Sequence, residues 1–94
     1  MKFKNVYKSA EEGPHHCPCC HCLTLSERGG FEICPVCFWE DDGQDDHDAN
    51  EVRGGPNGKL SLSGARSNYR TFAACEKSAL QHVRPPTTSE RAST

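Results

Sequence analysis

Apolar side chains are scarce in this chain of 94 residues: hydrophobic residues make up 34% of it and aromatic residues only 7%. Small chains bury a smaller fraction of their surface than large ones, so a short and polar chain needs a disulfide or a bound metal to stay folded. The length allows one domain at most. The composition therefore excludes a fold that rests on a large hydrophobic core.

Long apolar runs are also missing. The N-terminal stretch MKFKNVYKSAEEG carries basic residues but no apolar core of a signal peptide, and no run in the chain reaches the length of a membrane span. We therefore expect a cytoplasmic protein with no membrane association. In that compartment the seven cysteines stay reduced, so metal binding is favoured over disulfide formation.

Cysteine, in contrast, is abundant and follows a repeated pattern. Cys17-Pro-Cys-Cys20 and Cys34-Pro-Val-Cys37 both read Cys-Pro-x-Cys, and the thirteen residues between them are enough for a hairpin that brings the pairs together. Two such pairs are typical of zinc knuckles that share one ion, so the spacing predicts a four-thiolate site. We expect one Zn²⁺ per chain, with iron as the minor alternative because four thiolates also suit a rubredoxin-like centre.

A metal held by four protein sulfurs has no open position for water or substrate, so we expect no enzymatic activity and no catalytic residues. The thiols of Cys19 and Cys22 and the side chain of His21 lie beside the site in sequence and are possible secondary ligands. Packing or surface roles are favoured for all three, and Cys75 is expected to be a core thiol.

The predicted fold is a small metal-stabilised α+β domain resembling a zinc ribbon. Alternating apolar residues predict a hairpin of Leu23–Leu25 with Phe31–Ile33, and Phe38–Glu40 a third short strand. A loop follows, then one C-terminal helix that begins after an N-cap at Ser61 and either runs on or breaks near Cys75. The expected core consists of Leu23, Leu25, Phe31, Ile33, Phe38, Trp39, Leu62, Tyr69 and Phe72.

The expected organisation has three parts. Residues 1–14 form a partly disordered lead-in, residues 15–86 form the domain, and residues 87–94 form a disordered tail. The prolines at positions 85 and 86 are expected to end the helical region.

Acidic residues gather in one place, because seven of the thirteen lie between Glu40 and Glu51. One interpretation is a solvated loop, and a functional alternative is a weaker second cation site. Our first hypothesis for function is a non-catalytic, zinc-stabilised interaction module that binds a protein partner through the anionic loop of residues 40–51. The candidate partner-binding residues are Trp39, Glu40, Asp41, Asp42, Asp45, Asp46 and Asp48. A nucleic-acid-binding ribbon using Lys59, Arg66, Arg70 and Arg84 is the second hypothesis. A thiol-redox or metal-handling protein is the third.

Several segments in order carry a family resemblance: CPCC, FEICPVCFWEDDG, GGPNG, SL, NYRTFAACE and HVRPP. From about Cys17 to Pro86 the chain resembles the bacterial cysteine-rich CPCC family of small proteins. The resemblance implies a metal-binding zinc ribbon with an appended helix and no particular activity. It carries the family's cysteines onto Cys17, Cys19, Cys20, Cys34, Cys37 and Cys75. This chain departs from the family at His21-Cys22, where a glycine is usual, so we expect either a locally different first turn or an unusual backbone angle at His21.

Overall fold

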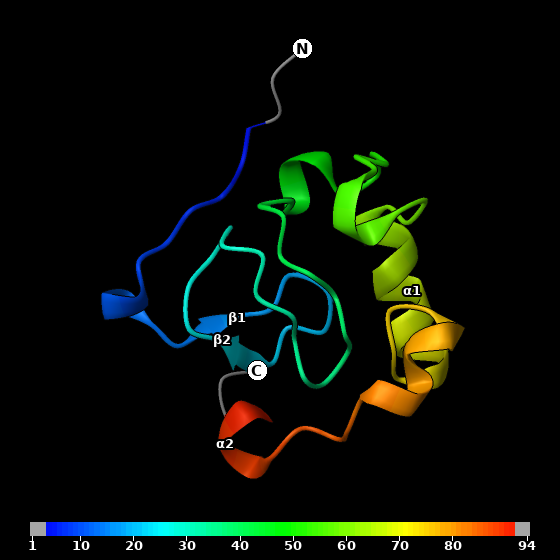
Figure 1. The fold of residues 1–94 in the computed structure, drawn as a ribbon. Coiled ribbons are helices and arrows are strands. Elements are labelled where there is room, and N and C mark those ends of the chain that lie inside the picture. Colours follow the sequence, from blue (N-terminus) through cyan, green and yellow to red (C-terminus); the bar gives the residue numbers. More distant parts are fainter. Residues whose placement is uncertain (1–3, 92–94) are drawn as a thin grey trace.

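The regular elements of this protein are short (Figure 1). The computed structural model describes residues 4–91 as a small α+β fold, which agrees with the predicted class. The strands are β1 (His15–His16) and β2 (Leu23–Leu25), and the α-helices are α1 (Leu62–Phe72) and α2 (Thr88–Arg91). Turns of 3₁₀ helix lie at Ala10–Glu12, Asp46–Asp48, Gly55–Asn57 and Lys77–His82. Within residues 4–91, no helix is both long and apolar enough to cross a membrane.

The strand pairing differs from the predicted one. β2 pairs antiparallel with β1, and the connection between them is the first Cys-Pro-x-Cys turn. Residues 31–33 instead face residues 39–41: Ile33 bridges Glu40, and the amide of Phe31 donates to the carbonyl of Asp41 at 2.8 Å. Each cysteine turn therefore closes its own short ribbon. The expected turn at residues 26–30 is one residue shorter than these six-residue turns, so loop length does not explain the difference. The residues that flank each cysteine turn pair with one another instead.

Cysteines make up almost half of the buried hydrophobic core. Among residues 4–91, fifteen hydrophobic residues are buried and seven of these are the cysteines. Leu25, Trp39 and Leu62 are buried as predicted, and Phe38, Tyr69 and Phe72 pack against the core from its edge. The prediction was wrong for Phe31 and Ile33, which are 53% and 45% exposed because their ribbon lies at the surface. So few aliphatic side chains give the fold little stability of their own.

The predicted C-terminal helix is present and broken. Ser61 caps α1, since its side chain accepts a hydrogen bond from the amide of Gly64 at 3.0 Å. Leu62 and Ala65 face the core. Ala73 ends α1 with a left-handed φ of 67°, and after a bend the chain continues as the 3₁₀ turn Lys77–His82. In Figure 1 this helical segment lies along one flank of the molecule, opposite the N-terminal lead-in.

Both ends of the described chain are attached to the body. In the lead-in, the amide of Val6 donates to the carbonyl of Gly43 at 2.8 Å and Lys8 bridges Arg28. Where a disordered tail is predicted, residues 88–91 form α2, beside β2, and Glu90 accepts hydrogen bonds from Arg84. The expectations for residues 1–3 and 92–94 lie outside the described residues. The boundaries of the domain stay a prediction.

Candidate metal centre

Four cysteine sulfurs from the two turns meet at one buried point. The Sγ atoms of Cys17, Cys20, Cys34 and Cys37 all lie within 4.8 Å of one another. Cys17 and Cys37 approach to 3.6 Å, and Cys20 and Cys34 to 3.7 Å. A tetrahedral ion with metal–sulfur bonds of about 2.3 Å requires sulfur–sulfur edges of about 3.8 Å. The four cysteines are therefore placed to bind one metal ion, and they are the four that the spacing predicts.

The two turns repeat one backbone design. In the first, the amide of Cys17 donates to the carbonyl of Cys22 and the amide of His21 to the carbonyl of Cys17, both at 2.8 Å. In the second, Cys34 and Trp39 pair in the same way at 3.0 Å, and Phe38 donates to Cys34 at 2.8 Å. The residue after each second cysteine, His21 or Phe38, has a left-handed φ, of 67° and 72° respectively. The unusual backbone angle at His21, one of the two expected alternatives, is confirmed.

This angle yields a prediction at His21. The left-handed region costs a residue with a Cβ about 1 kcal/mol, and glycine avoids that cost. Because His21 is exposed, His21→Gly should lose little packing and raise the free energy of unfolding by about 1 kcal/mol. Denaturant unfolding of the metal-loaded protein measures this change.

Phe38→Gly is the matched control for His21→Gly. It relieves the same backbone angle but removes a ring stacked on His82, with centroids 4.9 Å apart, and packed against the core. We expect Phe38→Gly to destabilise the protein. If His21→Gly destabilised it equally, backbone strain would not be the deciding term at His21.

The sulfurs of the second turn receive additional donors. The amide of Val36 lies 3.4 Å from the sulfur of Cys34, and that of Trp39 lies 3.5 Å from the sulfur of Cys37. The hydroxyl of Thr24 lies 3.0 Å from the sulfur of Cys34. Hydrogen bonds from Cys17 and the other two cluster thiols, and from Thr24, lower the pKa of Cys34 well below its usual range. These donors favour the thiolate form of Cys34.

The helical segment is fastened to both turns through their backbone. The Nε of Arg66 in α1 donates to the carbonyl of Pro18 at 2.7 Å, and the amide of Arg84 donates to the carbonyl of Pro35 at 3.2 Å. The amide of Cys75 donates to the carbonyl of Cys37 at 2.8 Å. The break after α1 thus places Cys75 against the second turn, and the helix and the cluster form one unit.

The remaining cysteines lie close by but outside the four-sulfur group. Cys19, Cys22 and Cys75 are buried, and burial raises the pKa of Cys75 to about 12 and raises that of Cys22. The expectation that Cys75 is a core thiol is confirmed. Among the described residues, the four-cysteine cluster is the only group of three or more His, Cys, Asp or Glu side chains close enough to hold an ion. Cys19, Cys22 and His21 are not part of it.

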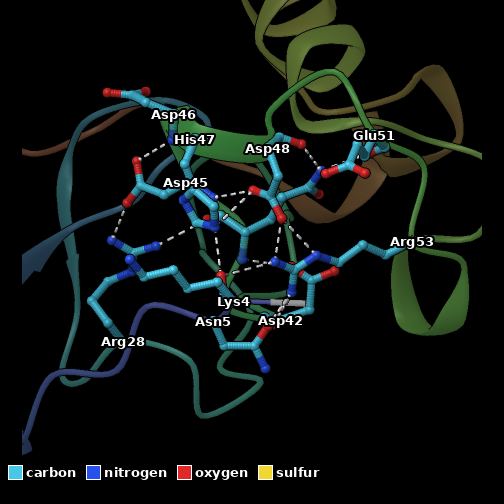
Figure 2. Close-up of polar contacts among 12 residues, drawn as sticks. Lys4, Asn5, Arg28, Asp42, Asp45, Asp46, His47, Asp48, Glu51 and Arg53 are labelled. Carbon is cyan, nitrogen blue, oxygen red and sulfur yellow. Dashed lines mark hydrogen bonds and ion pairs between the residues drawn. The ribbon is translucent and has the colours of Figure 1, made fainter. Parts of the chain in front are cut away.

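Part of the acidic loop is turned into the molecule. Asp41 is fully buried; one of its oxygens accepts from Arg28 Nε at 2.9 Å and from the amide of Gly29 at 2.7 Å. Arg28 reaches Asp45 as well, at 2.8 Å, and this pairing lowers the pKa of Asp45 against the opposing effect of its partial burial. Figure 2 shows Arg28 directed at the loop. The sequence shows that acidic residues gather in this loop, but it does not show that Arg28, thirteen residues before Asp41, pairs with it.

The other half of the loop is held in the same way. Arg53 forms an ion pair with the buried Asp48 and donates to the carbonyl of Asp42 at 2.9 Å, and it also contacts the lead-in at Asn5 (Figure 2). Asp42 and Trp39 are buried too. The side chains of Trp39, Asp41, Asp42 and Asp48 thus face inward, and the partner-binding role of the loop stays a prediction. Asp46 is the contrast, with a side chain that is 85% exposed.

The geometry defines a class: a small cysteine-rich domain organised around four sulfurs that can hold one metal ion. The model of the Cysteine-rich CPCC family matches residues 15–90, and the chain belongs to that family. The comparison with curated proteins and the comparison with solved structures gave no match. The family resemblance inferred from the motifs is confirmed, and the span from Cys17 to Pro86 lies within the matched residues.

Proposed function

We propose that this protein is a zinc-holding structural module without catalytic activity, which acts by binding a protein partner. The observation that carries the proposal is the closed group of four buried sulfurs, all within 4.8 Å of one another. Four thiolates fill the coordination sphere of a tetrahedral ion, as in structural zinc sites. When bound, the ion supplies a cross-link between two turns of a chain whose own core is small.

Metal analysis of protein purified without added ions tests the identity of the ion. We expect a colourless protein that contains one zinc per chain. A red protein that contains one iron per chain would show that the ion is iron and not zinc. Electron transfer would then be the better proposal, since iron bound by four thiolates changes oxidation state.

The absence of catalysis is supported by the thiols outside the cluster. A reactive cysteine needs an exposed, deprotonated sulfur, whereas Cys19, Cys22 and Cys75 are buried and the pKa of Cys75 is raised to about 12. We expect these three thiols to react with an alkylating reagent far more slowly than free cysteine in the zinc-loaded protein. Reaction as fast as that of free cysteine would favour the thiol-redox alternative.

A protein partner is favoured over nucleic acid because two of the four candidate basic side chains are already engaged within the fold. Arg66 binds Pro18 and Asp46, and Arg84 binds Glu90. We expect no binding to single- or double-stranded oligonucleotides at low salt. Binding whose logarithmic affinity falls linearly with the logarithm of salt concentration would favour nucleic acid over a protein partner. The surface available to a protein includes large exposed apolar side chains, namely Tyr7, Phe31, Ile33, Val52 and Leu80.

The partner hypothesis is tested by two variants that change different parts of the surface. A Phe31→Ser, Ile33→Ser protein removes exposed apolar area from the second ribbon, whereas Asp46→Lys reverses a charge of the acidic loop whose side chain is 85% exposed. We expect the first variant to lose partners captured from the source cells and the second to keep them. Loss with Asp46→Lys alone would return the interaction to the loop.

A further inference from the structure

Thr24 lies outside the two cysteine turns, and within residues 4–91 its side chain reaches a sulfur of the cluster directly. Its Oγ1 lies 3.0 Å from the Sγ of Cys34, and it comes from β2. A strand alternates its side chains, so Thr24 points away from the face that carries Leu23 and Leu25. This alternation directs the hydroxyl of Thr24 toward the second turn.

The direction of this hydrogen bond is fixed once an ion is bound. A cysteine that ligates a metal is a thiolate and has no proton to donate. The hydroxyl of Thr24 must then be the donor and the sulfur of Cys34 the acceptor, which makes the bond charge-assisted and stronger than a neutral one. The amide of Val36, at 3.4 Å, is a second donor to the same sulfur.

Among the contacts of residues 4–91, Cys34 is the cluster sulfur that accepts a hydroxyl group. Donors to a ligand atom orient it and stabilise its negative charge, and removing such a partner typically weakens metal binding 10–100-fold. The sulfur is buried, so no solvent replaces the lost donor.

We propose that Thr24 is a positioning residue of the metal centre, whose hydroxyl holds the Cys34 thiolate on a soft divalent ion and slows its release. This inference rests on the proposed metal site and assigns a role that the cysteine spacing does not contain. Thr24 orients a ligand and does not itself bind the ion.

Zinc transfer to a chromogenic chelator at neutral pH measures the effect. Thr24→Val has nearly the same shape and suits a strand, and we expect it to release zinc about 10-fold faster than the wild type. Thr24→Ser restores the hydroxyl and should return the rate close to the wild-type value. Thr71→Val is the matched control, because Thr71 is exposed and bonds only within α1, to Ser67.

The cobalt-loaded protein provides a readout that a purely structural role would not change. A thiolate without its donor is easier to oxidise, so the sulfur-to-cobalt charge-transfer bands of Thr24→Val should move to longer wavelength. The d–d bands of tetrahedral cobalt should stay in place. If Thr24→Val fails to fold with excess metal, Thr24→Ala and Thr24→Ser provide the same comparison, since they differ only in the hydroxyl.

The outcomes separate the two claims. A wild-type protein that binds neither zinc nor cobalt overturns the proposed function. A wild type that binds both, with release rates and spectra identical in the variants with and without a hydroxyl, overturns the role of Thr24 and leaves the metal site intact.

Discussion

We expect Cys34→Ser to leave the protein without a cooperative unfolding transition at neutral pH. The substitution removes one of four sulfurs that surround a single point, and it removes the one that accepts from both Thr24 and Val36. Structural zinc contributes an apparent ~10–16 kcal/mol to small zinc-finger domains, as much as the whole stability of an ordinary domain. Circular dichroism during thermal and denaturant unfolding, with equimolar zinc present, measures the loss.

Cys22→Ser is the matched control for Cys34→Ser. Cys22 is also a buried cysteine, but it lies outside the cluster, where its thiol points at the carbonyl of Cys20 at 3.9 Å. We expect this variant to bind one zinc and to unfold cooperatively, with a cost on the order of 1 kcal/mol for a polar atom at a buried position. Treating the wild type with a strong chelator should reproduce the effect of Cys34→Ser.

Two results would contradict this view of the fold. A Cys34→Ser protein that unfolds cooperatively without metal would show that the aliphatic core is sufficient. Equal losses from Cys34→Ser and Cys22→Ser would show that burial of the thiols, and not their arrangement around an ion, provides the stability.

Each half of the ligand set was readable from the sequence because it depends on local spacing. The Cys-Pro-x-Cys spacing favours a tight turn that brings Cys17 near Cys20 and Cys34 near Cys37, whereas the meeting of the two pairs depends on the rest of the fold. The break near Cys75 was foreseen only as an alternative. The structure gives its physical basis, because the amide of Cys75 has to reach the carbonyl of Cys37.

The strand pairing and the acidic loop were not readable in the same way. Leu23–Leu25 and Phe31–Ile33 both alternate, and alternation identifies strands without saying which of them pair. The contact of Thr24 with Cys34 is predictable from the alternation with Leu23 and Leu25, but only once it is known that the second cysteine turn lies beside β2. The burial of Asp41 depends on Arg28 and on the crossing lead-in, and such long-range pairing leaves no local pattern.

Asp41→Asn tests whether the acidic loop is an internal network or a surface. The amide that replaces the carboxylate has the same shape but cannot neutralise Arg28, which is 6% exposed and would keep its ion pair with the half-buried Asp45. Leaving a buried charge with no partner costs about 3–5 kcal/mol, and the remaining pair with Asp45 should keep the loss below that range. The fall in the free energy of unfolding of the zinc-loaded protein measures this loss, and zinc stoichiometry should remain one per chain.

Asp46→Asn is the control that matches Asp41→Asn in chemistry and in loop. Asp46 also binds an arginine, Arg66 at 2.7 Å, but its side chain is 85% exposed, and ion pairs at the surface contribute about 0–1 kcal/mol.

A double-mutant cycle of Arg28→Gln with Asp41→Asn measures the buried pair directly. It should give a coupling energy of about 1–3 kcal/mol, as for residues in one network.

The contrast between these two aspartates decides what the loop is for. If Asp41→Asn and Asp46→Asn were equally mild, the carboxylate of Asp41 would be free of Arg28 in solution and available to a basic partner. If Asp41→Asn alone is severe, the charge of Asp41 is neutralised inside the molecule by Arg28. The loop then joins the lead-in to the ribbon that carries Cys34 and Cys37, and the carboxylates that face solvent, such as that of Asp46, are the ones left for a basic partner.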